Sequence, residues 1–216
     1  MADFSSLYPE IAIEVPGCPE LLIEAAVRRA IRRFLRESEI WRGDLAAVDF
    51  DPAVSLIDVA ALAPDADTAV LGIDMVRRVS DGKPLTFMAR VELDDDIADW
   101  TKETGTKPSI YTLESPTSAR IVPVADATVV GEIVFRVVFG VASTSTTIPD
   151  WIFDEYDEAI RYGALSNLMK TPGKDWTDVN LAIAHGNLFE ASIVSASSDK
   201  GAEFGTPDRE VHYGGI

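Results

Sequence analysis

The sequence predicts an α+β fold in which N- and C-terminal segments build a helical bundle with a β-rich insert between them. Three observations lead to this prediction. A long amphipathic helical pattern lies near the N-terminus, short β-favouring runs fill the middle, and helical patterns return after Thr147. The predicted bundle covers residues 17–42 and 148–196, the insert covers 43–147, and 197–216 form a flexible C-terminal tail.

The first helix is predicted over residues 19–38. Proline suits the first helical turn, and Glu20 places negative charge near the positive end of the helix dipole. Apolar residues recur at steps of three and four, as on one buried face: Ile23, Val27, Ala30, Ile31 and Phe34. The other face carries five arginines, Arg28, Arg29, Arg32, Arg33 and Arg36. Glu24 with Arg28, and Arg33 with Glu37, are favourable pairs at a spacing of four.

The middle of the chain alternates β-favouring runs with turn residues. The four main predicted strands are residues 54–59, 69–79, 85–93 and 132–141, with shorter candidates at 110–113 and 119–124. The turn residues 80–84 predict a hairpin between the second and third of these strands. The acidic stretch 94–104 is predicted to form a single helical turn or a loop.

Two helices are predicted in the C-terminal part. The first begins at Ile148-Pro149-Asp150 and stops at residues 171–174. Gly163-Ala164 lies in its middle, where glycine costs about 1 kcal/mol relative to alanine, so this small pair predicts a close helix crossing. The second runs from about Thr177 or Asp178 to about Val194, with one face formed by Leu181, Ala184, Leu188 and Ser192, and with Phe189 beside it.

Composition limits the classes of function. The 216 residues include 36 acidic and 19 basic side chains, for a formal net charge of −17. This charge opposes nucleic-acid binding through phosphate contacts. The single cysteine, Cys18, excludes an intrachain disulfide and a cysteine-based zinc site. We see no signal peptide and no apolar run near the roughly 18 residues of a membrane span, so no membrane partner is predicted.

No catalytic, cofactor-binding or metal site is predicted, and the chain is expected not to be an enzyme. Its two histidines, His185 in a predicted helix and His212 in the tail, are too few for a histidine-based constellation. Phosphate-binding loops, dinucleotide fingerprints and nucleophile elbows are absent from the sequence. Asp94-Asp95-Asp96 with Asp99 lack the glycine and distal glutamate of a calcium loop, so a solvated acidic turn capping a short helix is favoured.

The five arginines invite a nucleic-acid interpretation, which the acidic excess of the chain opposes. Contact with an acidic surface is favoured instead. That surface belongs either to a neighbouring copy of the chain or to this chain, for example near Asp154, Glu155, Asp157 and Glu158.

An ordered set of motifs over residues 19–190 resembles a known family. One is the helix Tyr156-Asp157-Glu158-Ala159-Ile160-Arg161-Tyr162-Gly163-Ala164-Leu165, which leads into the loop Pro172-Gly173-Lys174-Asp175-Trp176 and a further helix with Ala184 and Phe189. Before it come Phe34-Leu35-Arg36-Glu37-Ser38, Ile57-Asp58-Val59 and Gly82-Lys83-Pro84-Leu85. The set is similar to the head-to-tail adaptor (connector) proteins of tailed bacteriophages, the type called tail tubular protein A. The first 16 residues and those after Ala196 fall outside the resemblance.

The resemblance implies a structural virion protein at the head–tail interface, assembled in the host cytoplasm. Such adaptors form a homo-oligomeric ring, usually a dodecamer, that joins the portal protein to a tail or nozzle protein, and DNA passes through the ring only as cargo. On this basis we expect inter-subunit contacts from Arg28, Arg32 and Arg36. The expected portal-docking residues are Tyr213, Gly214, Gly215 and Ile216. Two alternatives remain open: a monomeric ligand-binding β domain with flanking helices, and a metal-dependent enzyme subunit with its site at Asp94, Asp95 and Asp96.

Overall fold

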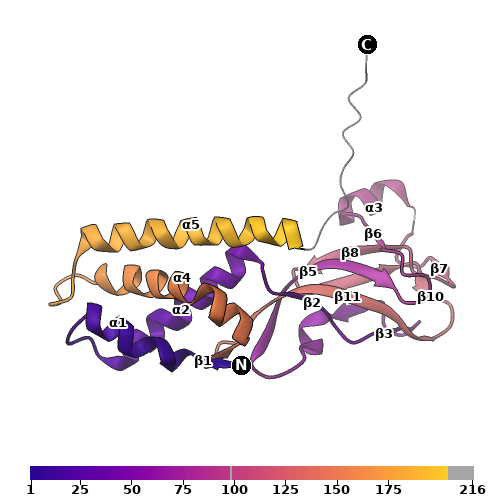
Figure 1. Ribbon diagram of the computed structural model, residues 1–216. Helices are drawn as coiled ribbons and strands as arrows, with labels where there is room; N and C mark the ends of the chain where they lie inside the picture. Colours follow the sequence, from indigo (N-terminus) through magenta and orange to yellow (C-terminus); the bar gives the residue numbers. More distant parts are fainter. Residues whose placement is uncertain (98, 204–216) are drawn as a thin grey trace, which may run out of the picture. The chain divides into compact units, whose positions relative to one another are not determined.

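The computed structural model describes residues 1–97 and 99–203, with side chains described as far as residue 198 (Figure 1). The chain mixes α-helices and β-strands, which confirms the predicted mixture of the two. Its contacts divide it into two compact units. The helical unit consists of Met1–Ile40 and the chain from Thr146 onward, and the β unit is Trp41–Ser145.

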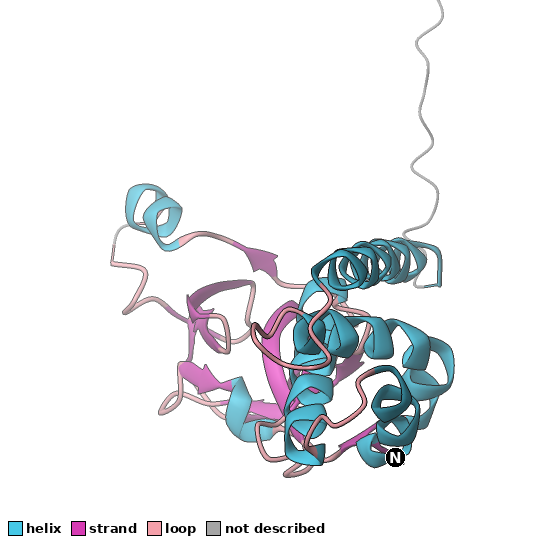
Figure 2. Ribbon diagram, turned by 90° about the vertical axis from the view of Figure 1, so that its left-hand side faces the viewer, coloured by secondary structure: helices cyan, strands magenta, loops and turns pink. Residues whose placement is uncertain are grey.

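The helical unit contains four α-helices, the group of cyan ribbons beside the N-terminus in Figure 2. In chain order its elements are β1 (Ala2–Asp3), η1 (Phe4–Leu7), α1 (Tyr8–Glu14), α2 (Glu20–Ser38), β12 (Thr147–Ile148), α4 (Asp150–Met169) and α5 (Val179–Glu203). Strands β1 and β12 pair antiparallel, so the two chain segments of the unit are joined by a short ladder as well as by helix packing. Both α2 and α4 begin directly after a proline, as the sequence predicts.

The core of the helical unit lies where α2, α4 and α5 meet. The Phe34 ring contacts Tyr156 at 5.0 Å and Phe189 at 6.4 Å between ring centroids. A Cβ on Gly163 would lie 2.9 Å from the Cβ of Ala30 and 2.9 Å from a ring carbon of Phe189. Glycine therefore lets three helices approach at one point, which confirms the predicted close crossing.

The ends of the helical unit correct two sequence predictions. Helix α5 continues to Glu203, so the predicted helix end at Val194 and the flexible tail from residue 197 are wrong for residues 195–203. Serine is compatible with the helix here because the Ser192 and Ser198 hydroxyls donate to carbonyls four residues earlier, both at 2.9 Å. The first 16 residues form ordered elements, with Phe4 and Ile11 fully buried.

The β unit is built around the long strand β11 (Val129–Val141), which the sequence predicts well. It pairs antiparallel with β5 (Thr68–Arg78), β2 (Arg42–Asp44) and β3 (Val48–Phe50). A second sheet has the order β4 (Leu56–Asp58), β9 (Ser118–Val122), β8 (Ile110–Ser115) and β6 (Thr86–Phe87). Short strands β7 (Thr104–Gly105) and β10 (Val124–Ala125) pair in parallel, and η2 covers Val59–Leu62.

Side chains from both sheets form the core of the β unit. Val76 and Phe135 on the first sheet belong to the same buried cluster as Ala119 and Ile121 on the second. Phe135 has no exposed surface. The two sheets therefore bury their apolar faces against a shared core.

The predicted strand over residues 85–93 is wrong beyond Phe87, because helix α3 (Arg90–Asp96) takes its place. The Glu92 side chain accepts a hydrogen bond from the Ala89 N–H at 3.0 Å and so caps the start of this helix. Leu93 is fully buried beside Trp100. The predicted hairpin is present but short. Arg77 and Pro84 form an antiparallel bridge across the turn, the Arg78 N–H donates to the Lys83 carbonyl and the Leu85 N–H donates to the Val76 carbonyl, and β6 then pairs in parallel with β8.

Candidate interaction surface

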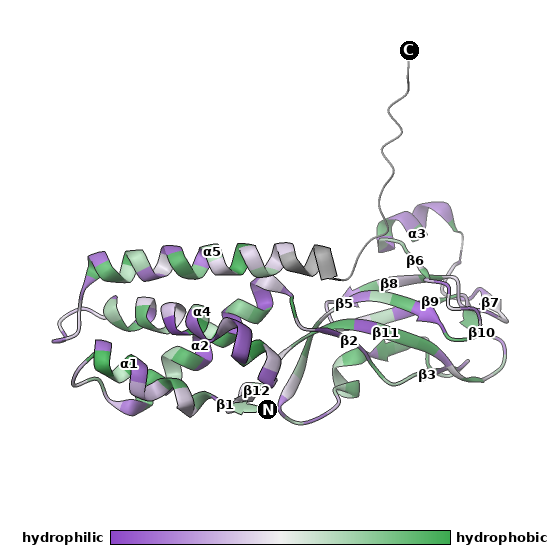
Figure 3. Cartoon of the chain, viewed as in Figure 1, coloured by the Kyte–Doolittle hydropathy of each residue, from purple (hydrophilic) through white to green (hydrophobic). Residues whose placement is uncertain are grey.

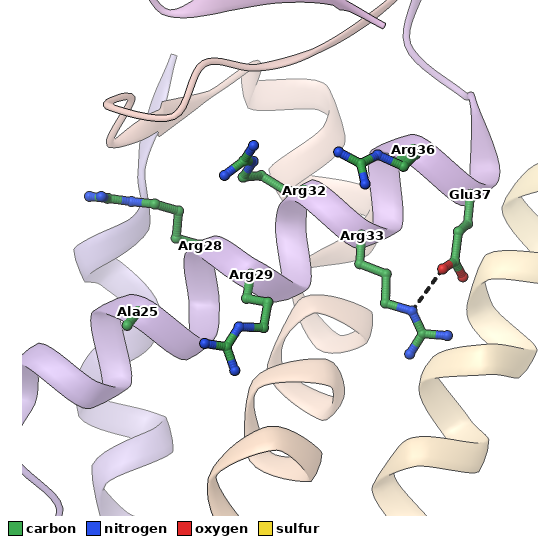
Figure 4. Close-up of a pocket in the computed structure, with 7 residues that line it drawn as sticks. All are labelled: Ala25, Arg28, Arg29, Arg32, Arg33, Arg36 and Glu37. Atoms are coloured by element: carbon green, nitrogen blue, oxygen red, sulfur yellow. Dashed lines mark hydrogen bonds and ion pairs between the residues drawn. The ribbon is translucent and has the colours of Figure 1, made fainter.

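Helix α2 displays five arginines, which we call the arginine face: Arg28, Arg29, Arg32, Arg33 and Arg36. They line an open groove of about 480 Å³ together with Ala25 and Glu37 (Figure 4). The apolar residues Ile23, Val27 and Phe34 are buried on the other side of the helix. The 3.6-residue repeat of the helix therefore separates a packed side from a cationic one.

Two of these arginines have partners within the helical unit. Arg28 pairs with Glu24 at 2.6 Å, and Arg33 pairs with Glu37 at 2.8 Å, as the spacing of four predicts. Arg33 also bonds to Glu190 on α5, and its guanidinium lies 5.5 Å from the centre of the Phe189 ring. The hydrogen bond with Glu37 raises the pKa of Arg33 further above its ordinary value.

The other three arginines, Arg29, Arg32 and Arg36, are exposed, and they have no hydrogen bond or ion pair with any described side chain, in residues 1–97 and 99–198. Arg32 and Arg36 extend to the same side of α2, whereas Arg29 and Arg33 extend to another (Figure 4). The intramolecular carboxylates of the arginine face are Glu24, Glu37 and Glu190, not the acidic run at 154–158 that the sequence suggests. Three positive charges thus remain available to an anionic partner.

Helix α4 displays the acidic face, which we define as Asp154, Glu155, Asp157 and Glu158. All four side chains are exposed. Glu158 accepts a hydrogen bond from the Tyr162 hydroxyl at 2.6 Å, and this bond raises the pKa of Tyr162. Asp157 accepts from the backbone N–H of Glu158 at 2.6 Å. Asp154 and Glu155 have no such partner in the part of the chain that the structure describes.

Helix α5 carries exposed apolar side chains that the sequence does not mark as surface residues. We call four of these side chains, Leu181, Ile183, Leu188 and Val194, the exposed α5 apolar residues. At 3.6 residues per turn, Leu181 and Leu188 lie on one flank of the helix, and Ile183 and Val194 lie on the opposite flank. Ile183 is 52% exposed and Val194 is 65% exposed. The buried residues of α5 are instead Ala182, Phe189, Ile193 and Ala196. Figure 3 shows hydrophobic residues along much of α5. When apolar residues lie on more than one side of a helix, the periodicity of the sequence does not predict which side is buried.

The remaining sequence candidates occupy structural positions. His185 is packed inside the helical unit, where its ring stacks on Tyr162 at 5.5 Å and its Nε2 lies 3.6 Å from Glu14 Oε2. Asp94 accepts a hydrogen bond from the Trp100 indole at 2.7 Å. Among the described residues, His, Cys, Asp and Glu side chains form no group of three placed to hold a metal ion.

Two further findings concern the chain as a whole. The helices of residues 1–97 and 99–203 include none that combines the length and the apolar character needed to cross a membrane. The expected portal-docking residues, Tyr213, Gly214, Gly215 and Ile216, lie outside the described residues.

Comparison with known proteins identifies the family. Residues 3–210 match the family model of the SU10 adaptor protein. The chain therefore belongs to the SU10 adaptor protein family, which makes it a phage adaptor, a structural component of the virion. The matched range includes most of the first 16 residues and the C-terminal part of α5. Both segments lie outside the motifs that carry the resemblance. Individually curated proteins gave no match.

Proposed function

We propose that this protein is a head-to-tail adaptor whose copies form a ring that joins the portal to the tail and surrounds the DNA channel. The observation that carries the proposal is the family match over residues 3–210. A structural adaptor works by holding partners in place, so its function depends on interface area and not on turnover.

The surfaces of the helical unit support a role in assembly. The exposed α5 apolar residues leave apolar surface in water on two flanks of the helix, and clustered apolar surface of this kind is typical of protein contacts. The arginine face adds three unpaired cations. We expect Arg28, Arg32 and Arg36 to contact a neighbouring subunit.

We assign different positions to the parts of the chain. The helical unit, with the bundle segments 17–42 and 148–196, docks at the portal, and the β-rich insert 43–147 faces either outward or toward the tail or nozzle protein. Tyr213 and Ile216 mark the segment that we expect to dock on the portal. We propose a dodecamer as the copy number of the ring.

The charge of the chain fits DNA as passing cargo. With 36 acidic and 19 basic residues, most of the surface repels phosphates. A channel wall that binds phosphates tightly would slow the passage of DNA, whereas an acidic wall lets DNA slide. We therefore propose no stable complex between this protein and DNA.

Electron microscopy of the full chain mixed with the portal protein of the same phage tests the proposal, with the portal alone as control. The expected result is an additional ring, coaxial with the portal, that the portal alone lacks. The proposal fails if the chain stays monomeric both alone and with the portal and if no such ring appears in virions.

A further inference from the structure

We propose that the arginine face of α2 in one copy docks on the acidic face of α4 in the next copy. This inference rests on the proposed ring and names the two surfaces that join its subunits. Its starting point is that each face leaves charges without partners in the described chain: Arg29, Arg32 and Arg36 on α2, and Asp154 and Glu155 on α4.

The position of the arginine face follows from how α2 meets α4. Helix α2 contacts α4 through Phe34, which packs on Tyr156, and through Ala30, which lies against Gly163. A helix has 3.6 residues per turn, so the mean direction of positions 28, 32 and 36 around the helix axis is about half a turn away from that of positions 30 and 34. Arg28, Arg32 and Arg36 of the arginine face therefore point away from α4.

The acidic face lies on the exposed side of α4, on both sides of a kink in the helix at Tyr156. Tyr156 and Gly163, through which α4 meets α2, are buried, whereas residues 154, 155, 157 and 158 are exposed. The helical unit thus exposes a cationic face on α2 and an anionic face on α4.

This arrangement suits a ring. In a ring, every subunit presents one surface to the copy before it and a different surface to the copy after it. A cationic face on one helix and an anionic face on another give each copy both surfaces that a ring contact needs. A contact between two identical faces would instead bring like charges together. A second copy also supplies partners for both faces at once, which nucleic acid would not do.

The test uses charge reversal at exposed positions, so that folding is preserved. The first variant is Arg32→Glu/Arg36→Glu. The second is Asp154→Lys/Glu155→Lys, which spares Glu158, the partner of Tyr162, and Asp157, the partner of the Glu158 N–H. The control for the first is Lys102→Glu/Lys107→Glu, which makes the same change in net charge at exposed residues of the β unit. Circular dichroism checks the fold of each variant.

Assembly is measured by sedimentation and electron microscopy, alone and on the portal protein of the same phage. Each reversal variant is expected to reduce its assembled fraction by about tenfold or more, while the control assembles like the wild type. A mixture of the two variants in equal amounts should assemble again, because the reversed acidic side of one variant then meets the reversed basic side of the other in alternating order. The quadruple variant that carries both reversals should also assemble.

Two outcomes overturn the inference while the proposed function stands. These are normal assembly of either reversal variant, and failure of both the mixture and the quadruple variant to recover. If the wild type itself forms no ring under any of these conditions, the proposed function fails and the inference fails with it.

Discussion

The two units differ in how many of their arginines form ion pairs within the chain. The β unit contains six arginines, and each has an ion pair: Arg42 with Asp74, Arg77 and Arg136 with Asp44, Arg78 with Asp81, and Arg90 and Arg120 with Glu114. The described part of the helical unit also contains six, of which Arg29, Arg32 and Arg36 have no partner there. The β unit therefore pairs all of its arginines internally, whereas the helical unit leaves three arginines for contacts outside the chain.

Apolar side chains show a related contrast within the helical unit itself. The junction of α2, α4 and α5 is packed so closely that only glycine fits at position 163, yet the outer side of α5 exposes Leu181 and Leu188. One side of α5 is buried in a closely packed core, and the other side has exposed apolar residues of the kind found at protein interfaces. We infer that the helical unit is the part adapted to assembly.

The largest expected effect lies in the core of the β unit. Phe135→Ala removes a fully buried ring that lies between the two sheets, so we expect a loss of about 3–5 kcal/mol in unfolding free energy. Denaturant titration measures the loss, and hydrogen exchange locates it. Faster exchange confined to the β unit would support its independence, and equal acceleration in the helical unit would contradict the two-unit comparison.

The next largest effect is expected at the helix junction. Gly163→Val would force a side chain against Ala30 and Phe189, and overpacking of this kind costs about 1–3 kcal/mol. Thermal unfolding followed by circular dichroism measures it. Ala184→Val, on the exposed side of α5, is the matched control and should change stability by less than about 0.5 kcal/mol. Equal effects would show that the junction is loosely packed.

A smaller loss of stability is expected when an internal ion pair of the β unit is weakened. Asp44→Asn weakens the contacts of Arg77 at 2.7 Å and Arg136 at 3.3 Å, and we expect a loss of about 0.2–1 kcal/mol because these side chains are partly exposed. Urea titration at low and high salt measures the loss, which should shrink as salt screens the charges. A loss that does not depend on salt would mean that Asp44 acts by packing instead.

The smallest effect is expected at the arginines without partners. Arg36→Ala should leave the stability of the free chain within about 0.5 kcal/mol of the wild type, because no described contact is lost. The same urea titration provides the measurement. A loss equal to that of Asp44→Asn would contradict the contrast between the two units, since it would reveal an internal role for Arg36.

Local signals made part of this structure predictable from the sequence. The prolines at 19 and 149 mark the starts of α2 and α4, and alternating apolar residues mark β11. The pairs Arg28 with Glu24 and Arg33 with Glu37 follow from helical spacing alone. Each of these features is set by residues within a few positions of one another.

Features that depend on distant residues escaped prediction. Residues 90–93 resemble a strand, but Glu92 caps a helix and Leu93 is buried with Trp100. The contact of Arg33 with Glu190 joins positions 157 apart in the sequence. Which side of α5 faces solvent depends on the position of α4, because both sides of α5 are apolar.

The most direct test of the central claim is a cryo-electron microscopy structure of the protein assembled on its portal, at a resolution that shows side chains. The account predicts that Arg32 and Arg36 of each copy lie against Asp154 and Glu155 of the next copy. If these arginines face solvent in the assembled ring, and subunits meet only through the β unit, the claim that the helical unit supplies the assembly surfaces is wrong.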